Sequence, residues 1–351
     1  MEDMVKLLKE HFDSHPDMEI RDAVKFLYQS HMGVGHLISD EAAALTYLET
    51  EWAQVKADSS APLTEPLGGG MCRLQLSACK GTGLSIQTVF RLFLLTAQQA
   101  APDRSGLERD LELVYDLPFP RAAAEAELAQ FKAQVCPTVS HSPRYRAAYA
   151  PAYRVISQKL ARLLPLLCAI DQEMSCNPFV RVAIDGPCAS GKSTLGEELS
   201  QIYSCPLIHM DDFFLHPEQR TEERLSQPGG NVDYERFLQE VLLPLTRQEA
   251  ACYRPWRCRM GGFDAPVTVP PCPLVLVEGS YSLRPDLRDH YQLRVWVEAP
   301  TEERLERLAQ RGGPGCLERF RTMWIPLENR YFDACRVKEC CQLFISGSKS
   351  Q

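Results

Sequence analysis

The residues best suited to chemistry form one short run between positions 186 and 193. The run reads GPCASGKS and matches the phosphate-loop pattern G-x-x-x-x-G-K-[ST]. Its glycines allow backbone N–H groups to turn toward a phosphate, Lys192 supplies a mobile cation, and Ser193 is expected to hold Mg²⁺. The run therefore predicts a Walker A site for ATP and Mg²⁺. The residues expected to contact the nucleotide are Gly186, Pro187, Cys188, Ala189, Ser190, Gly191, Lys192, Ser193 and Thr194.

The elements that must hold this loop are visible on either side of it. Residues 179–184 form a short apolar segment typical of a buried strand. After the loop, Leu195, Leu199 and Ile202 recur at i, i+4 and i+7, the spacing of an apolar helix stripe. The order strand, loop, helix is the context that a phosphate loop requires.

Acidic residues follow two further apolar segments, residues 206–210 and 274–277. Asp211 and Asp212 follow the first segment, and Glu278 follows the second. Ligands of parallel α/β sheets bind beyond the carboxyl ends of the strands, so we expect these carboxylates to lie beside the phosphate loop. Glu278 is a candidate for binding Mg²⁺ through water or for supporting its coordination shell. The alternative for Asp211 is a helix cap or turn aspartate.

Arginines recur on one face of the helix predicted over residues 301–310. Arg304, Arg307 and Arg311 have the three- and four-residue spacing that puts side chains on a common helix face. Phosphoryl transfer requires a phosphate cradle, Mg²⁺, a base for the acceptor hydroxyl and cations near the transferred group. The alternative is a solvated charged face, which is the stronger interpretation for Arg311.

The chain divides by pattern into two domains. Residues 178–351 alternate strands with helices, adding strands at 293–297 and 343–345, and predict a parallel α/β sheet flanked by helices. Residues 1–172 predict a mainly α-helical domain of unknown role, with loops at 57–70 and 137–143. Its predicted helices are 4–12, 19–30, 40–55 with Ser39 as a candidate N-cap, 85–99, 120–135 and 150–167.

Composition limits the function classes. The chain has 351 residues, of which 45% are hydrophobic and 24% charged, and a net charge of −8, which argues against a broad nucleic-acid surface. The N-terminus lacks a signal-peptide pattern, and no run approaches the roughly 20 apolar residues of a membrane span. We therefore expect a cytoplasmic protein that binds a small molecule and neither nucleic acid nor membrane. A homo-oligomer is left open.

Cysteines and histidines leave two alternatives open. The fourteen cysteines contain no C-x-x-C pair and are expected to be reduced thiols. Cys188, inside the loop, is either a thiolate favoured by positive surroundings or a small filler, and we favour the filler. His31 and His36 are either a ligand pair or part of a turn at the helix stop Gly33, and we favour the turn.

Residues 179–345 resemble the uridine kinase branch of the P-loop small-molecule kinases, which also includes phosphoribulokinase and bacterial pantothenate kinase. The motifs that carry the resemblance follow in order along the chain. After the phosphate loop they are DDFF at 211–214, NVDYERF at 231–237, VEG at 277–279 and RLER at 304–307. The resemblance implies an α/β P-loop kinase domain that transfers the γ-phosphate of ATP to an alcohol group.

The resemblance also implies roles for single residues. Asp211 would accept the hydroxyl proton, or Asp212 if the register is shifted by one, while Lys192 acts on the phosphates. Arg304 and Arg307 would be lid arginines over the phosphates. Asp233 and Tyr253 would lie near the acceptor. The chain has Tyr234 after Asp233 where the family has histidine, and RPWR after Tyr253, so only the reaction type is carried over.

Two functions remain in view. The first is an ATP-dependent kinase for a hydroxyl of a nucleoside-like or other sugar-bearing metabolite, with the helical domain shaping or regulating the site. The second is an ATP-binding switch with slow hydrolysis, whose helical domain binds a protein partner. Asp211 and the two lid arginines favour the kinase, because a switch needs no base aimed at an acceptor hydroxyl.

Overall fold

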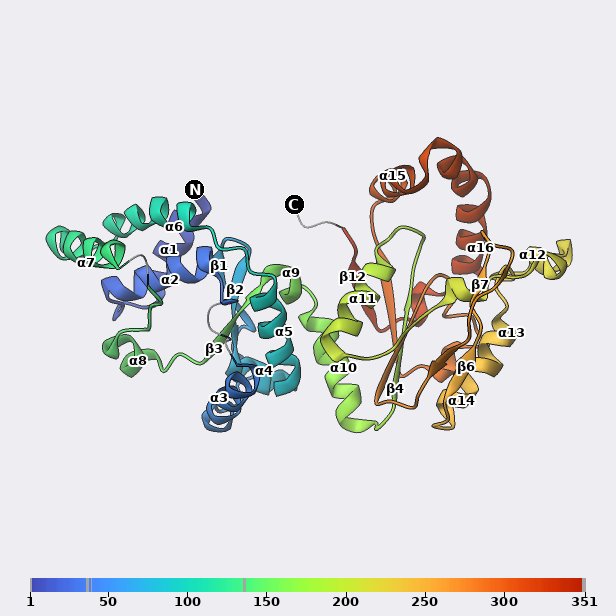
Figure 1. The fold of residues 1–351 in the computed structure, drawn as a ribbon, viewed down its shortest axis with the longest axis horizontal. Helices are drawn as coiled ribbons and strands as arrows, with labels where there is room; N and C mark the ends of the chain where they lie inside the picture. The colour runs from blue at the N-terminus through green and yellow to red at the C-terminus, as the bar shows by residue number, and fades with distance from the viewer. Residues whose placement is uncertain (1, 36–37, 39, 135–136, 349–351) are drawn as a thin grey trace. The chain divides into compact units, whose positions relative to one another are not determined.

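The structure, a computed structural model, describes residues 2–35, 38, 40–134 and 137–348 (Figure 1). The chain forms two compact units, Met1–Cys168 and Ala169–Gln351. The first unit thus ends a few residues before the position suggested by the sequence, because helix α10 (Leu164–Cys176) runs across the change of unit. Each unit has its own hydrophobic core.

The N-terminal unit is mainly helical and contains a small antiparallel sheet. Its elements are α1 (Glu2–Ser14), α2 (Ile20–Met32), α3 (Glu41–Gln54), β1 (Thr64–Gly68), β2 (Met71–Gln75), α4 (Leu76–Thr82), α5 (Ile86–Gln98), α6 (Arg104–Asp110), the 3₁₀ segment η2 (Leu111–Asp116), α7 (Arg121–Ala133), α8 (Pro143–Tyr149), β3 (Tyr153–Ser157) and α9 (Gln158–Ala161).

The sheet of this unit contradicts two predictions. The predicted helix at 150–167 is interrupted by β3, and the predicted loop at 57–70 contains β1; both pair with β2 in the order β1-β2-β3. Tyr153, Val155 and Ile156 are aromatic or β-branched residues, which favour strands, and Ile156 pairs with Cys72 of β2. The short strand was missed because the apolar helices that follow it extend the same hydrophobic pattern.

Helix ends in this unit follow local capping chemistry. The carboxylate of Asp40 accepts hydrogen bonds from the N–H groups of Ala42 and Ala43 and so caps α3. Ser39, the predicted cap, and His36, half of the predicted histidine pair, lie outside the described residues, as does residue 135 at the predicted end of α7. Gly33 ends α2 with a φ of 60°, as expected for a glycine stop.

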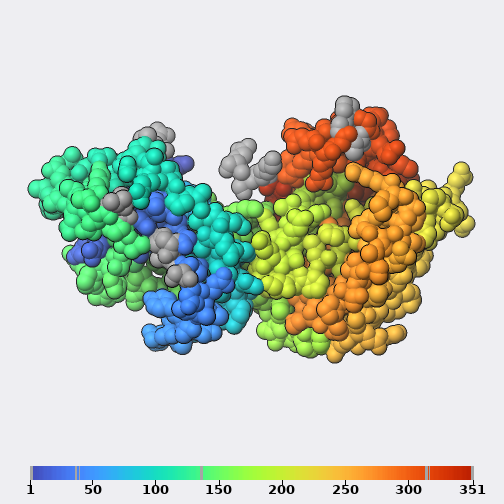
Figure 2. Space-filling model, viewed as in Figure 1, coloured from blue at the N-terminus to red at the C-terminus, as the bar shows by residue number. Residues whose placement is uncertain are grey.

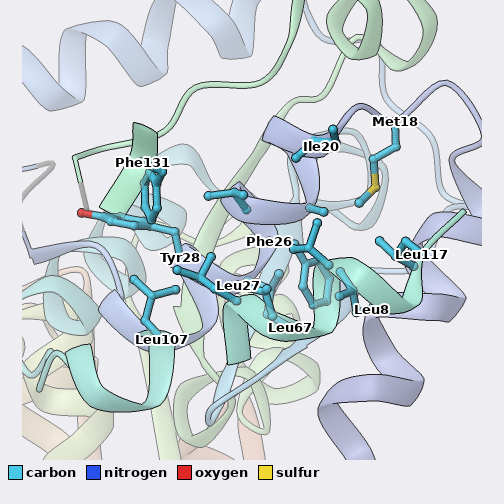
Figure 3. Close-up of a cluster of buried hydrophobic side chains, with 14 of the residues drawn as sticks. Leu8, Met18, Ile20, Phe26, Leu27, Tyr28, Leu67, Leu107, Leu117 and Phe131 are labelled. Carbon is cyan, nitrogen blue, oxygen red and sulfur yellow. The ribbon is translucent and has the colours of Figure 1, made fainter. Parts of the chain in front are cut away.

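The core of the N-terminal unit is formed mainly by the inward faces of its helices. Figure 3 shows Phe26 and Leu27 of α2 among apolar side chains from other elements. Leu8 of α1 and Leu67 of β1 are almost fully buried in the same cluster. Helix α5 packs on β3 and α3. The small sheet is therefore held between helices rather than exposed on a face.

The C-terminal unit has the predicted alternation of strands and helices. Its main elements are β4 (Val180–Asp185), α11 (Lys192–Tyr203), β5 (Leu207–His209), the 3₁₀ segment η3 (Met210–Phe213), α12 (Glu222–Ser226), α13 (Tyr234–Phe237), α14 (Leu243–Thr246), β6 (Ala251–Tyr253), β7 (Trp256–Arg257), β8 (Gly262–Phe263), β9 (Val267–Val269), β10 (Leu274–Glu278), β11 (Leu293–Glu298), α15 (Thr301–Arg319), the π-helical segment η7 (Phe320–Trp324), α16 (Ile325–Cys335) and β12 (Leu343–Ser346).

A five-stranded parallel sheet organises this unit, in the order β12-β11-β4-β10-β5. Every residue of β4 and β10 is buried, as expected for strands covered on both faces. The chain builds β5 and β10 on one side of β4 and then crosses to β11 on the other side. This reversal makes the carboxyl end of β4 the expected ligand site of the sheet. The arrangement is the parallel α/β sheet flanked by helices that the sequence predicts.

Helices cover the sheet on both faces. Helix α11 packs on β4, β5 and β10. Buried residues of the 237–245 segment and of α16 join the apolar cluster that includes Val277 and Trp296. Helix α15 continues to Arg319, well beyond the predicted end at 310. Within the described part of the chain, no helix is both long enough and apolar enough to span a membrane.

Candidate active site

The phosphate loop connects β4 to α11 at the centre of the sheet. Gly186 has a φ of 146°, and a Cβ atom there would overlap the carbonyl oxygen of Val297 in β11, so only glycine fits. Gly191 has a φ of 105° and caps α11. The backbone of Gly347, after β12, lies against the carbonyl oxygen of Ser190. Close contacts with β11 and with the residue that follows β12 thus restrict the conformation of the loop.

The loop presents the donors that a polyphosphate requires. Among the described residues, the N–H groups of Gly191, Lys192, Ser193 and Thr194 have no hydrogen-bond partner, and they begin α11. The hydroxyl of Ser190 is buried and also has no partner in the described part of the chain. Free N–H groups at a helix N-terminus are the usual cradle of an anion, so these residues fit the phosphates of ATP.

Lys192 folds back over the same loop. Its Nζ donates to the carbonyl oxygens of Gly186, at 2.8 Å, and Pro187, at 3.0 Å. The side chain is buried. An ammonium group has three N–H donors, so one donor remains for a phosphate oxygen. Ser193, in contrast, is exposed in the first turn of α11, where its hydroxyl is open to a metal ion.

Arg304 and Arg307 contact the loop through its carbonyl groups. Arg304 Nε donates to the carbonyl oxygen of Cys188 at 2.8 Å, and Arg307 Nη1 donates to that of Ala189 at 2.9 Å. The space-filling view shows α15 and α16, in red, beside the yellow-green segment that contains the loop (Figure 2). The structure therefore places both predicted lid arginines at the loop, holding its carbonyl groups. Arg311 is exposed, as its alternative interpretation predicts.

Cys188 is a small filler in this arrangement and not a thiolate. Burial and the neighbouring charge of Glu328 raise the pKa of its thiol to about 12, although Arg304 acts in the opposite direction. The positive surroundings considered for a reactive thiol are therefore outweighed, since a thiolate would be desolvated beside a carboxylate.

Asp211 is a carboxylate of the site that is not held by a described hydrogen bond. It follows β5 within η3, and the residue is exposed. Its carboxylate has no hydrogen-bond partner among the residues that the structure describes. Crowding by protein and the charge of Glu278 raise its pKa, while the charges of Lys192 and His209 lower it. A carboxylate with a raised pKa is a stronger proton acceptor than an ordinary one.

Asp212 has a different environment from its neighbour. It is buried, and its Oδ1 accepts a hydrogen bond from Arg257 Nη1 at 2.7 Å. Tyr253, which the sequence placed near the acceptor, also hydrogen-bonds to Asp212. Asp212 therefore joins two chain segments, Arg257 in β7 and Tyr253 in β6, to the end of β5. Because the carboxylate of Asp212 is already engaged in these hydrogen bonds, Asp211 is favoured over Asp212 as the base.

Glu278 lies at the end of β10, next to β5. Its Oε1 is 2.5 Å from Nδ1 of His209, and this contact raises the pKa of His209. Its Oε2 accepts no hydrogen bond from a described residue, so it remains for a metal ion or a water molecule. With the exposed hydroxyl of Ser193, this oxygen provides the hard ligands that Mg²⁺ prefers. The residues present thus fit the predicted ion.

Asp233 is engaged within the protein. Its Oδ1 accepts the N–H of Arg236 and caps α13, and its Oδ2 accepts Gln219 Nε2 at 2.9 Å. Asp233 is also buried. The structure therefore brings Asp212 and Tyr253 together beside Asp211, but gives Asp233 a structural cap instead of a free carboxylate for the acceptor.

Two buried acids that support the loop were missed in the sequence. Asp185, fully buried, accepts hydrogen bonds from the N–H of Gly186 and the hydroxyl of Tyr331, and burial raises its pKa to about 6. Glu328 of α16 accepts the N–H of Cys188 at 2.9 Å. Asp185 could have been noticed as an acid ending an apolar strand. Glu328 carries no local signal, because 140 residues separate it from its partner.

The N-terminal unit contains a polar cluster whose residues could hold a metal ion. The hydrogen-bonding pattern of His11 instead accounts for the arrangement. His11 and His15 are one helical turn apart, and His11 Nδ1 is 2.6 Å from Glu65 Oε1. However, Arg73 Nη1 approaches His11 Nε2 at 3.2 Å. A donor there requires Nε2 to accept, so Nδ1 carries the proton that faces Glu65. A metal at Nδ1 would have to displace that proton beside a buried guanidinium.

His31 is likewise explained by a protein partner, because its Nε2 lies 2.9 Å from Asp110 Oδ2.

Solved structures similar to this chain include three that are described as kinases. A possible uridine kinase from Bacillus stearothermophilus shares 16% identity, with a TM-score of 0.39, over 52% of this chain and 99% of the other. A protein assigned as a fructose transport system kinase from a Silicibacter species shares 26% identity, with a TM-score of 0.43, over 52% and 98%. A D-glycerate 3-kinase from Cryptococcus neoformans shares 16% identity, with a TM-score of 0.37, over 51% and 88%.

Each of these structures matches only about half of this chain. No protein-family model and no curated protein matches the sequence.

Proposed function

We propose that this chain is an ATP- and Mg²⁺-dependent phosphotransferase that phosphorylates a hydroxyl group of a small molecule. The observation that carries the proposal is Asp211, an uncommitted carboxylate of raised pKa at the strand end next to the phosphate loop. The charges of Lys192 and Glu278 act on Asp211, which supports a site that combines a base, a cation and a metal ligand.

The residues divide the work of phosphoryl transfer. Mg-ATP, when bound, supplies the γ-phosphoryl group, which forms a bond to the acceptor oxygen as its bond to the β-phosphate oxygen breaks. Asp211 takes the proton that the acceptor hydroxyl loses. Lys192 and the free N–H groups at the start of α11 stabilise negative charge on the phosphates. Ser193 and Glu278 would hold Mg²⁺.

The acceptor side is built from Asp212, Tyr253 and Arg257, whose contacts with one another fix the wall beside Asp211. A buried carboxylate paired with the exposed guanidinium of Arg257, beside a buried phenol, suits a polar acceptor with several hydroxyl groups, such as a nucleoside-like or other sugar-bearing metabolite. Arg257 lies in the segment where the chain departs from the uridine kinase pattern, so the proposal names this class and no single compound.

An acceptor screen tests the proposal. ADP release by the full-length protein is measured with nucleosides, pantothenate-like alcohols and sugar phosphates, each against a reaction without acceptor. We expect at least one class to raise ADP release well above that background and to yield a phosphorylated product in mass spectra. Lys192→Ala serves as the control for contaminating kinases. Slow ADP release that no acceptor stimulates would contradict the proposal and favour an ATP-binding switch.

A further inference from the structure

The N-terminal unit contains a cavity of about 320 Å³ that the proposed reaction does not use. Helices α2, α3 and α5 and strand β3 surround it. This volume lies at the lower end of the range of small-molecule sites. The lining residues that bear on its chemistry are Lys25 and Gln29 from α2, Tyr47 and Glu51 from α3, Phe93 from α5 and Arg154 from β3.

Arg154 is a buried cation with an unused donor. Only 8% of the residue is exposed, and its Nη1 donates to Glu51 Oε2 at 2.6 Å and to the carbonyl oxygen of Tyr153. Its Nη2, in contrast, is buried and has no hydrogen-bond partner among the described residues. Buried guanidinium donors are rarely left unpaired, because the lost hydration is not replaced. A ligand in the cavity that Arg154 lines would supply the missing acceptor.

Gln29 adds a second donor. Its Oε1 accepts hydrogen bonds from Arg73 Nε and Nη2, at 3.3 and 3.1 Å. A guanidinium has only donors, so Arg73 fixes the side-chain amide of Gln29 with its oxygen toward the protein interior. The NH₂ group of Gln29 has no hydrogen-bond partner among the residues that the structure describes. It can therefore donate a hydrogen bond to a ligand in the cavity.

The charge balance of the lining is positive. Lys25 Nζ donates to the carbonyl oxygen of Val139 at 2.9 Å, which leaves two of its three N–H donors. Glu51 is the lining carboxylate, and it is already paired with Arg154. His141, also in the lining, is held neutral between Asp22 and the hydroxyl of Tyr153, because burial lowers its pKa to about 4. Donors and positive charge thus outnumber acceptors.

The rest of the lining is apolar or aromatic. The ring centroids of Tyr47 and Phe93 lie 5.6 and 5.8 Å from the guanidinium carbon of Arg154. Tyr47 is 69% exposed, an unusual state for a tyrosine that carries an apolar face, and it stands at the cavity. A flat or apolar body beside the rings, with an anionic group at Arg154, would match both features of the lining.

We propose that the N-terminal unit binds a small organic anion in this cavity, namely a carboxylate or phosphate group on an aromatic or apolar body. The anionic group meets Arg154, Gln29 and Lys25. This site is separate from the phosphate loop in sequence and in its residues, so the proposal does not depend on the function of the C-terminal unit.

Binding of three simple probes to the full-length protein tests the proposal. The probes are benzoate, phenyl phosphate and the uncharged benzyl alcohol, with dissociation constants measured by NMR titration. We expect at least one of the two anions to bind, and to bind about tenfold or more tightly than benzyl alcohol, because the alcohol cannot satisfy the cations. The preferred anion distinguishes a carboxylate ligand from a phosphate ligand. Absence of binding by both anions at 10 mM, or equal binding of the alcohol, would overturn the proposal.

Matched variants on α3 locate the binding. Ala44 lines the cavity, whereas its neighbour Ala43 is exposed and does not. Ala44→Trp should fill the cavity and weaken anion binding about tenfold or more, while Ala43→Trp should leave it unchanged. Arg154→Gln should weaken binding similarly, and the α3 pair decides the matter if that variant does not fold. Equal binding by both α3 variants would assign the anion to another site, such as the phosphate loop, and overturn the proposal.

Discussion

Mild acid should unfold the N-terminal unit selectively. His11 and His141 are buried in its polar cluster, with 4% and 7% of each residue exposed. Burial, together with the charges of Arg73 and, for His141, Lys25, lowers the pKa of each imidazole from 6.5 to about 4, although Glu65 and Asp22 act in the opposite direction. In mild acid, the two imidazoles therefore stay neutral in the folded unit but are protonated in the unfolded chain.

The size of the effect follows from these pKa values. Between pH 6.5 and 4 the unfolded state binds more protons, so the free energy of unfolding falls as the pH falls. At pH 5, each histidine with a pKa of 6.5 unfolded and about 4 folded removes about 2 kcal/mol, or about 4 kcal/mol for both. Asp185 acts oppositely in the C-terminal unit. Burial raises its pKa to about 6, which stabilises that unit by about 1 kcal/mol at pH 5.

Urea unfolding near pH 7.5 and near pH 5 measures this difference. Hydrogen-exchange mass spectrometry, corrected for the intrinsic rate, reads peptides of α2 and β3 separately from peptides of β4 and β10. The N-terminal peptides should lose protection at lower urea in acid, while the C-terminal peptides should not. His141→Gln should remove about half of the acid effect, whatever it does to stability at neutral pH. An unchanged N-terminal midpoint at pH 5, or a full acid effect in His141→Gln, would refute the reasoning.

Three further changes concern the phosphate loop. Lys192→Ala should reduce ATP turnover by about 10²-fold or more with an unchanged circular dichroism spectrum, because it removes phosphate charge stabilisation and not core packing; normal turnover would contradict the assignment. Gly186→Ala should abolish measurable Mg-ATP binding in calorimetry, since the new Cβ meets the carbonyl oxygen of Val297; retained affinity would show that the loop adapts. Arg307→Ala should lower kcat about tenfold or more. Arg311→Ala is the control, because Arg311 is on the same helix but exposed, and it should leave kcat unchanged. Equal effects of the two substitutions would contradict a specific role of Arg307 at the phosphate loop.

The C-terminal fold could be predicted because its signals are local. The phosphate loop, the buried strands and the residues at strand ends each lie within a few positions of one another. The parallel sheet, the loop on β4 and the two aspartates after β5 were therefore predicted from the sequence and are present in the structure. The roles assigned to single residues, such as the lid function of Arg304 and Arg307, stay predictions.

What the sequence did not reveal depends on distant partners. Glu328 meets Cys188 across 140 residues, and Arg73 meets Gln29 across 44. Neither contact leaves a periodic pattern. Strand β3 was predicted as helix because its pairing with β2 overrides the apolar spacing that continues into the following helices. Asp233 was expected near the acceptor, and its role as a helix cap was not foreseen, although it stands three residues before a helical N–H.

The most direct test of the proposed kinase compares Asp211→Asn with Asp212→Asn. With the acceptor that emerges from the screen, Asp211→Asn should lower acceptor phosphorylation by about 10²-fold or more while Mg-ATP binding persists, because the amide cannot take the proton. Asp212→Asn should cost less, since Asp212 acts through its contacts with Arg257 and Tyr253. Undiminished phosphorylation by Asp211→Asn, or a larger loss in Asp212→Asn, would contradict the assignment of Asp211 as the base.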